Sequence, residues 1–570
     1  RSASDLQRAA NGQSLDPSIS ANGERIAFAS TATDLLAGLS GPTASNIYSF
    51  EIGSATLTLT THAAGTPNLR ADQHSAEPAL SANGRWLAFI SDSRDLIAGL
   101  IDPTGGVGFL RNVYLADLDS GTVELVSHQA SSPLALSPGA SNTPTVSADG
   151  RHVAYSGGHA GLVAGMSMPP SGGRPTILFD RQSGANRVVS HVAGQPLSSI
   201  SAPRSLVCSD GSRVIYSSGS AILAFDVSDG AVTLVSHAPG SPGVPGTQRV
   251  FDFSCSADGR QIVFAREREV VGSDILTDIL LFDESAADLR LISHASASPG
   301  VPIAQSGWAA SIAAGGDVVV YTSTPTTSQD LVRDANLLQD VVSYSISTDT
   351  NAIQSLHAAS LASSTATTDI YLSVWGPTSL SRDGNVLAFT SRAPNLTLQQ
   401  VDPETTLDVF RHAVVPGETS LVSHRASAPG TAIGGWGWLA EDGSRIVWTS
   451  AASDVLPGAS DLNQGNDLFS TEGDGSQRLL SHAAGSPLSA GDSPVDRDAG
   501  FAGSADGRIV AFAGRGTNYL PGPIATDATL DVFDLCGTLP HAETPGLFAH
   551  RLRAFLQTLP SSLPPQPTRP

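Results

Sequence analysis

A Ser-His pair returns along the chain at an almost regular interval, and histidine is a side chain suited to act as a base or a metal ligand near neutral pH. One copy lies within the stretch LVSHAPGSP at residues 234–242. The recurring histidines are His62, His128, His191, His237, His294, His357, His424, His482 and, less well matched, His541. A base, a ligand and an architectural role are all open to a residue repeated in this way.

Acidic stretches form a second set of residues that could do chemistry. The segments DANLLQD, DPETTLD and DLNQGND each place oxygen-bearing side chains at the first, third and seventh positions, a spacing that resembles the start of a calcium loop but lacks the central Gly and distal Glu of an EF-hand. Two interpretations remain open: calcium sites that stiffen the loops, or Asx turns whose side chains bond to their own backbone. The candidate calcium ligands are Asp334, Asn336, Asp340, Asp402, Glu404, Asp408, Asp461, Asn463 and Asp467.

The elements that must position these residues are β-hairpins. Phrases such as PSISANGERIAFAS from Pro17 and FSCSADGRQIVFAR from Phe253 recur nine times, two copies being weaker. Each copy predicts two strands joined by an Asn-Gly or Asp-Gly turn, because these residues tolerate the positive φ of a type I′ turn. A third strand, such as NVYLADLDSG, and a fourth, such as VELVSH, then follow.

Four antiparallel strands repeated without helices between them predict the blades of a single all-β propeller. The phrase SADGR followed by DVF and LVS resembles the TolB-like beta-propeller repeat family over residues 15 to about 540. We expect about nine blades, with eight as the alternative. We also expect residues 4–10 of an N-terminal segment, 1–14, to close the ring by pairing into the last blade, which makes 15–545 the propeller.

Propeller geometry bears on the histidines. We expect the first strand of each blade to lie innermost and the Ser-His strand outermost, about 14 Å further out at a strand spacing of about 4.8 Å. One histidine per blade at that radius is too far from the others to converge on one metal ion. The pattern therefore favours imidazoles that bond to the backbone where the chain crosses to the next blade.

Composition excludes several classes of function. The net charge of −22 argues against a nucleic-acid partner, and all 31 basic residues are Arg, which excludes lysine chemistry. The three cysteines, Cys208, Cys255 and Cys536, form no C-x-x-C motif, and no apolar run reaches the length of a membrane span. The chain begins without Met, from which we expect a removed signal peptide and hence a secreted, periplasmic or cell-surface bacterial protein.

The segment 546–570 differs from the blades. Its apolar residues recur at helical spacing and predict a short amphipathic helix followed by a proline-rich tail. The helix would dock on its own propeller or on a partner, and both alternatives stay open. The predicted partner-binding residues are Phe548, Leu552, Phe555, Leu556 and Leu559.

The functional expectation is a non-catalytic binding or scaffold propeller with a protein partner and no cofactor beyond calcium. The chain has no G-x-S-x-G or H-E-x-x-H motif. Contacts are expected at the connections around Asp102 to Leu110 and Leu398 to Asp408. The alternative is a secreted polysaccharide lyase or glycosidase with its site in the channel, where sugar rings would stack on the aromatic side chains of Trp308, Trp375, Trp436 and Trp438.

Overall fold

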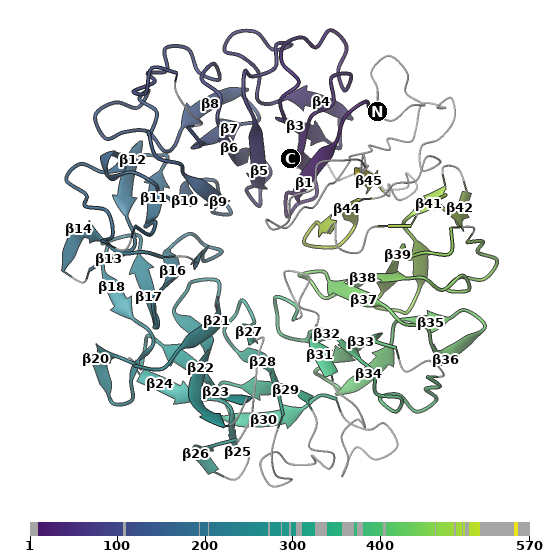
Figure 1. The fold of residues 1–570 in the computed structure, drawn as a ribbon. Coiled ribbons are helices and arrows are strands. Elements are labelled where there is room, and N and C mark those ends of the chain that lie inside the picture. The colour runs from purple at the N-terminus through teal and green to yellow at the C-terminus, as the bar shows by residue number, and fades with distance from the viewer. Residues whose placement is uncertain are drawn as a thin grey trace, which may run out of the picture.

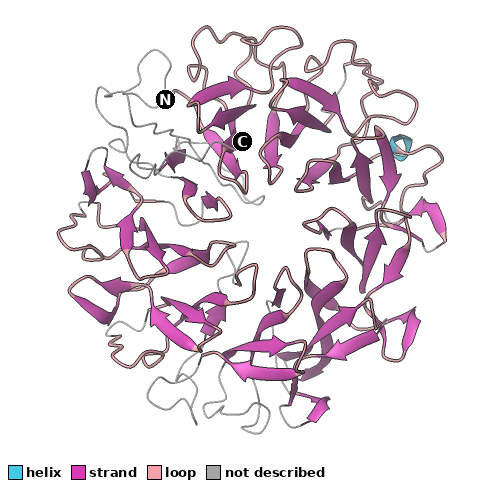
Figure 2. Cartoon of the chain, turned by 180° about the vertical axis from the view of Figure 1, so that it is seen from behind, coloured by secondary structure: helices cyan, strands magenta, loops and turns pink. Residues whose placement is uncertain are grey.

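The chain forms a ring of sheets arranged around a central axis (Figures 1 and 2). The computed structural model describes residues 10–106, 110–170, 172–192, 194–202, 204–271, 274–286, 288–295, 298–303, 310–324, 339–355, 370–372, 380–402, 406–461, 463–483, 486–492, 494–495, 501–513 and 552–556. Within these ranges, eight antiparallel sheets have four strands and a ninth has three, each in chain order. The predicted all-β propeller is confirmed. The number of blades stays a prediction, because most of the last unit lies outside the described residues.

The first four blades follow one another around the ring in chain order, anticlockwise from the N-terminus in the view of Figure 1. Blade 1 contains β1 (Ser14–Ile19), β2 (Arg25–Ser30), β3 (Asn46–Glu51) and β4 (Thr56–Leu59), and blade 2 contains β5 (Ser75–Leu80), β6 (Trp86–Ser91), β7 (Asn112–Asp117) and β8 (Thr122–Leu125). Blade 3 contains β9 (Asn142–Val146), β10 (His152–Ser156), β11 (Thr176–Asp180) and β12 (Ala185–Val188), with a short 3-10 helix, η1 (Ala160–Leu162), between β10 and β11. Blade 4 contains β15 (Arg204–Val207), β16 (Arg213–Ser218), β17 (Ala221–Asp226) and β18 (Val232–Leu234).

The remaining sheets continue the ring. Blade 5 contains β21 (Val250–Cys255), β22 (Gln261–Val271), β23 (Asp274–Asp283) and β24 (Asp288–Leu291), and blade 6 contains β27 (Ser311–Ile312), β28 (Val318–Ser323), β29 (Asp340–Ser345) and β30 (Thr350–Ile353). Blade 7 contains β31 (Ile370–Leu372), β32 (Val386–Ser391), β33 (Asp408–Ala413) and β34 (Glu418–Leu421), and blade 8 contains β37 (Trp436–Leu439), β38 (Arg445–Ser450), β39 (Asp467–Glu472) and β40 (Gln477–Leu479). The three-stranded sheet contains β43 (Phe501–Gly503), β44 (Ile509–Ala513) and β45 (Leu552–Leu556).

Five small hairpins lie outside the described four-stranded blades, at the rim. Each begins at a histidine of the Ser-His repeat. We predicted this histidine within the fourth strand, but that strand ends three residues before it, as β18 does at Leu234 before His237. The hairpins are β13 (His191–Val192) with β14 (Gln195–Ser199), β19 (His237–Ala238) with β20 (Ser241–Pro245), β25 (His294–Ala295) with β26 (Ser298–Pro302), β35 (His424–Arg425) with β36 (Ala428–Ala432), and β41 (His482–Ala483) with β42 (Ser486–Ala490).

The hydrophobic core lies between neighbouring blades. Middle strands such as β6 and β7 are buried along their whole length, because both faces of a blade are covered by its neighbours. The largest fully buried side chains include three tyrosines of third strands, Tyr48, Tyr114 and Tyr344, and Tyr216 of the second strand β16. A blade therefore has no stable core of its own, as expected of a repeat protein.

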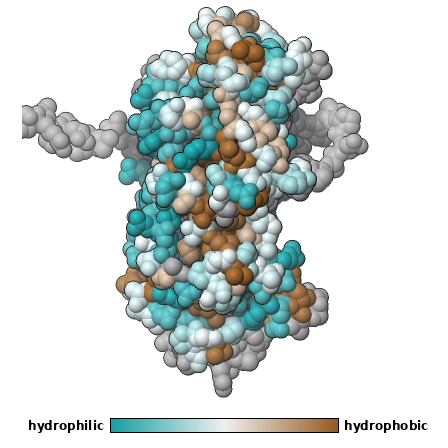
Figure 3. Space-filling model, turned by 90° about the vertical axis from the view of Figure 1, so that its left-hand side faces the viewer, coloured by the Kyte–Doolittle hydropathy of each residue, from teal (hydrophilic) through white to brown (hydrophobic). Residues whose placement is uncertain are grey.

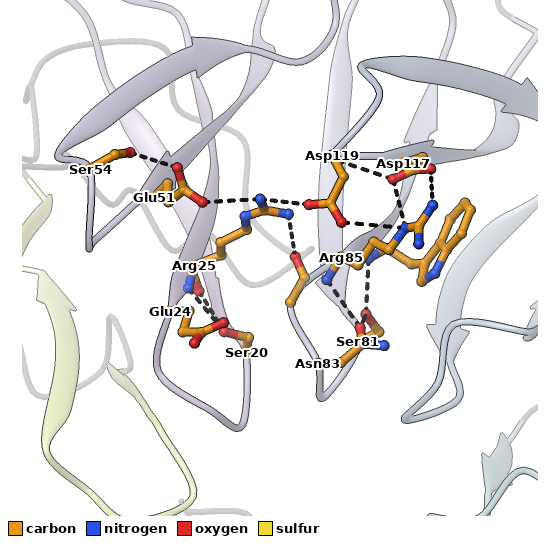
Figure 4. Close-up of polar contacts among 12 residues, drawn as sticks. Ser20, Glu24, Arg25, Glu51, Ser54, Ser81, Asn83, Arg85, Asp117 and Asp119 are labelled. Atoms are coloured by element: carbon orange, nitrogen blue, oxygen red, sulfur yellow. Dashed lines mark hydrogen bonds and ion pairs between the residues drawn. The ribbon is translucent and has the colours of Figure 1, made fainter. Parts of the chain in front are cut away.

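The hairpin turns bind one blade to the next. Gly150 has a φ of +73°, and a Cβ at this position would overlap the ring of Trp86 in blade 2, so only glycine fits. Backbone hydrogen bonds continue the contact around the inner ring, as from Ala257 N to Ala314 O at 3.0 Å. Side chains add to it: Arg25 of blade 1 contacts Glu51 of its own blade and Asp119 of blade 2 (Figure 4).

The ring closes through the same kind of contact. Ala505 N donates to Ala21 O at 3.0 Å, and Ala511 of β44 packs into the apolar cluster of blade 1 with Ile26 and Phe28. Of the predicted closing strand at residues 4–10, residues 4–9 lie outside the described residues, and Ala10 packs against the apolar cluster of blade 1. The domain boundaries at residues 14 and 545 also stay a prediction.

The predicted C-terminal helix is wrong for the residues that the structure describes there. Leu552–Leu556 form β45, which pairs antiparallel with β44, for instance Ala554 with Ala511. A free strand edge on β44 accepts any segment with suitable backbone, and this non-local pairing outweighs a local helical spacing of apolar residues. Of the predicted partner-binding residues, Leu552, Phe555 and Leu556 are in β45, and Phe548 and Leu559 lie outside the described residues.

Candidate binding surface

The repeated histidines are architectural. In each of the seven that the structure describes, Nδ1 donates to the carbonyl of the following residue, at 2.9 Å in His237 and 3.2 Å in His424. Four of these rings also meet an aromatic ring of the next blade edge to face, as His237 meets Phe282 with centroids 6.3 Å apart. The prediction of a backbone-bonded histidine at the blade crossing is confirmed for these residues, and His357 and His541 lie outside the described part.

The serine of the pair joins two strands of its blade. Ser481 Oγ accepts from Leu468 N at 2.9 Å and donates to Asp467 Oδ1 at 2.7 Å. Blade 2 repeats the arrangement with Ser127 Oγ, which donates to Asn112 Oδ1 at 2.8 Å. The polar residue that begins the third strand therefore fixes the fourth strand through one hydroxyl group.

This arrangement accounts for the seventh residue of the predicted calcium loops. Burial, with a smaller contribution from the nearby Asp461, raises the pKa of Asp467 to about 7, although the hydrogen bond from Ser481 lowers it. Burial likewise raises the pKa of Asp408 to about 7, with a contribution from Asp402. The raised pKa values show that burial disfavours the ionised form of these carboxyl groups, a cost that a bound cation would offset.

The first and third positions of the blade 8 loop form an Asx turn. Asp461 Oδ1 accepts from Asn463 N at 2.9 Å and Gln464 N at 3.0 Å, and Asn463 Oδ1 accepts from Gly465 N at 2.7 Å. Asp340 begins β29 and accepts from Ser355 Oγ at 2.7 Å. Asp334, Asn336 and Glu404 lie outside the described residues, and calcium binding at these loops stays a prediction.

Carboxylates also lie on the inner strands, but they bond to the backbone. Asp16 accepts a hydrogen bond from the backbone of Glu77, and Glu77 Oε2 accepts from Thr143 N at 2.9 Å. These three residues have φ values of 52°, 53° and 50°, so each forms a bulge at the same place in β1, β5 and β9. The carboxylates connect three blades in series rather than facing one another across a substrate.

The tryptophans and long connections also make internal contacts. Trp438 is buried in a cluster with Val510 and Phe512 of the last sheet, whereas Trp436 is half-buried. Trp308 and Trp375 lie outside the described residues. In the connection that starts at Asp102, this carboxylate accepts from Thr104 N at 2.8 Å, Gly106 N at 2.9 Å and Arg94 Nε at 2.7 Å.

One cleft lies on the turn face between blades 3, 4 and 5. It has a volume of about 910 Å³ and is lined by charged residues that include Arg151, Arg187, Arg213, Asp180 and Asp226. Most of these charges pair with each other, as Arg151 does with Asp180 at 3.0 Å. The cleft has no excess of one charge that would indicate an ionic ligand.

The connections between second and third strands give a different picture, because they differ strongly among blades. In blade 8, Ser460 N donates to Leu488 O at 2.8 Å and Ala490 N donates to Ser460 O at 2.8 Å, so the connection covers the outer edge of β42. Blades 3 and 7 show equivalent bridges. Blades 4 and 5 each leave only two residues between these strands, 219–220 and 272–273, and in blade 5 the long strands β22 and β23 form one ribbon.

The β22–β23 ribbon is the feature of blade 5 that sequence reasoning missed. Its strands have 11 and 10 residues, whereas β6 and β7 in blade 2 have 6 each. The pairing of β21 with β22 ends at Arg266, and the pairing of β24 with β23 ends at Leu280. The ribbon continues beyond its blade to Val271 and Asp274.

Charged residues anchor the base of the ribbon. Arg268 Nη1 donates to Asp278 Oδ1 at 3.0 Å across the two strands and to Ile303 O at 3.1 Å on the crossing to blade 6. Asp278 is buried, and burial raises its pKa although Arg268 and Arg266 lower it. The ribbon is thereby held at its base from both strands.

Apolar side chains lie near the ribbon's end. Val270 is 58% exposed. Ile275, its cross-strand partner, and Leu276 are half-buried, and Glu269 is exposed. The rim of the ring carries further apolar side chains singly among polar ones (Figure 3). No helix among the described residues is long and apolar enough to cross a membrane.

Comparison with known proteins gives structural likenesses alone. No family model and no curated protein matches the chain. Solved structures that it resembles include TolB from Acinetobacter baumannii, with 13% identity over 50% of this chain and 55% of that chain and a TM-score of 0.25. They also include dipeptidyl peptidase 4 from Porphyromonas gingivalis, with 10% identity over 90% of this chain and 65% of that chain and a TM-score of 0.47. The propeller domain of the trilobed protease from Pyrococcus furiosus matches with 11% identity over 82% of this chain and 97% of that domain, at a TM-score of 0.33.

Proposed function

We propose that this chain is a non-catalytic, protein-binding propeller that works outside the cytoplasm, in the bacterial envelope or beyond it. The observation that carries the proposal is the anchored β22–β23 ribbon. A two-stranded ribbon beyond its sheet has too little buried surface to be stable by itself. A partner that covers it would supply the missing burial, and the anchored base lowers the ordering cost of binding.

The chemistry of the ribbon specifies the kind of partner. Val270, Ile275 and Leu276 supply apolar area, and Glu267 and Glu269 flank it with negative charge. The whole chain carries a net charge of −22. A protein surface with an apolar centre and a basic rim is complementary to this end of the ribbon.

The test compares two exposed valines. Val270→Asp places a charge in the proposed contact, and Val244→Asp places one on the rim of blade 4, where the valine is 55% exposed. We expect a partner that co-purifies with the wild-type chain to be retained by the Val244 variant and lost from the Val270 variant, with equal melting temperatures. A photo-crosslinking residue at position 270 should link to the same partner.

Equal retention by both variants would overturn the proposal, as would crosslinking from position 244 and not from 270. Release of unsaturated or reducing sugar ends from polysaccharides by the purified chain would support an enzyme with its site in the channel instead.

A further inference from the structure

Two cysteines occupy neighbouring blades at nearly equivalent positions. Cys208 directly follows β15 and takes the place of the serine in the S-A-D-G turn, and Cys255 ends β21, one residue before that serine in its own turn. Both residues lie on the inner side of the ring, where successive turns contact each other.

The two turns are bound to each other by hydrogen bonds. Asp210 N donates to Ala257 O at 3.1 Å, and Ser212 Oγ donates to Asp258 O at 3.1 Å. Asp210 and Ala257 each lie two residues beyond one of the cysteines. The backbones that carry the two cysteines therefore run side by side from one blade to the next.

The sulfur atoms share one apolar environment. Cys208 is buried in a cluster with Phe253 and Ile262, and Cys255 packs against that cluster. A Cβ at Gly259, in the turn that follows Cys255, would lie 2.7 Å from Cys208 Sγ. The neighbouring Cys255 thiol, together with burial, raises the pKa of Cys208.

We propose that Cys208 and Cys255 form a disulfide that joins blade 4 to blade 5 when the protein meets an oxidising environment. The oxidant is a low-molecular-weight disulfide such as oxidised glutathione. Cys255, the less buried of the two, attacks it as the thiolate, forms a mixed disulfide and releases one small thiol. Cys208 then attacks the Cys255 sulfur of the mixed disulfide, its proton passes to the departing sulfur, and a second small thiol leaves.

Peptide mapping tests the linkage directly. The full chain is treated with oxidised glutathione, its remaining thiols are alkylated, and it is unfolded and cut by trypsin after arginine. Cys208 then lies in the peptide 205–213 and Cys255 in the peptide 250–260. We expect one linked species, two hydrogen atoms lighter than the two peptides together, that disappears on reduction.

Variants separate this pair from other outcomes. The linked species should persist in Cys536→Ser and be absent in Cys208→Ser and Cys255→Ser. The melting temperature should rise on oxidation in the wild-type chain and in Cys536→Ser, and should not change in Cys255→Ser. Alkylation of both peptides after oxidation, or linkage of either to the peptide of Cys536, would overturn the proposal.

Discussion

Replacing Asp467 by Asn should stabilise the protein at neutral and alkaline pH, because the ring already contains the substituted version of this site. Asn46 and Asn112 begin the third strands of blades 1 and 2, where Asp408 and Asp467 begin those of blades 7 and 8. Asn112 Oδ1 accepts from the hydroxyl of Ser127, the serine equivalent to Ser481, and the Asn112 amide donates to Leu110 O at 2.8 Å. An amide therefore satisfies the site without a charge.

The size of the effect follows from the pKa of the buried carboxyl group. Its pKa is raised from 3.8 to about 7 in the folded chain. The folded state thus binds this proton more tightly than the unfolded state, and the stability falls as the pH rises from about 4 through 7. A shift of about three pKa units corresponds to at most about 4 kcal/mol, lost in full above the folded pKa.

Denaturant unfolding at pH 5 and pH 8, with EDTA and with calcium, measures this effect. We expect Asp467→Asn to have a higher free energy of unfolding than the wild type at pH 8 in EDTA. The variant should also lack the part of the pH dependence of stability that comes from Asp467. Asp408→Asn, on the neighbouring blade, should behave alike. The reciprocal control is Asn46→Asp, which should lower the stability at pH 8 more than at pH 5.

The opposite result would identify a metal ligand. If Asp467→Asn is less stable than the wild type at pH 8, and only when calcium is present, the carboxylate binds the ion and the Asx interpretation of this loop is wrong. A lower stability in EDTA as well would show that the ionised carboxylate itself stabilises the fold, which would refute the reasoning from burial.

Two further substitutions test the rim. His237→Ala should lower the free energy of unfolding by about 2 kcal/mol. The variant loses one hydrogen bond and one edge-to-face contact with Phe282. Loss of partner binding at an unchanged melting temperature would contradict the structural role of this histidine. Pro245→Ala combined with Pro302→Ala should promote association of the chain, seen by light scattering, because each change adds an N–H to the uncovered edge of a rim hairpin. A strictly monomeric double variant would show that these prolines do not protect the edges.

Local chemistry explains which elements the sequence could predict. Asn-Gly and Asp-Gly turns fix a hairpin within a few residues, so the blades could be found from a single sequence. The burial of Asp467 depends on Ser481, a partner 14 residues away, and its raised pKa follows from that contact. No spacing rule distinguishes such a buried carboxyl group from a calcium ligand.

Two regions show where a local pattern fails. The apolar spacing around Leu552 predicts a helix, but β44 offers a free edge and the segment pairs with it as a strand. The β22–β23 ribbon had a usable signal, since the sequence continues from Gln261 with strand-forming residues and reaches Gly-Ser at 272–273 without a loop. Where the connection between the second and third strands is that short, the two strands must form a continuous ribbon.

The exceptional features of the ring meet at blades 4 and 5. Both blades lack the connection that covers the rim hairpin elsewhere, and both carry the sequence SPGVP in that hairpin. In blades 3, 7 and 8, the residue opposite the rim histidine donates its N–H to the connection between the second and third strands. In blades 4 and 5 the residue at this place is Pro245 or Pro302, and proline has no N–H that could be left unpaired. Proline thus guards the exposed edges against unspecific strand pairing.

Because proline protects the rim hairpin edges of blades 4 and 5, we expect a partner to bind another part of these blades. The anchored ribbon is the part of blades 4 and 5 that offers both backbone and apolar side chains to a partner, because the long connections are missing there and proline blocks the rim edges. Force on the ribbon would act on blade 5, whose inner strand ends at Cys255. A disulfide from Cys255 to Cys208 would close a loop of about 48 residues and contribute about 4 kcal/mol by restricting the unfolded chain. The covalent link would therefore stabilise the junction beside the blade that carries the proposed binding ribbon.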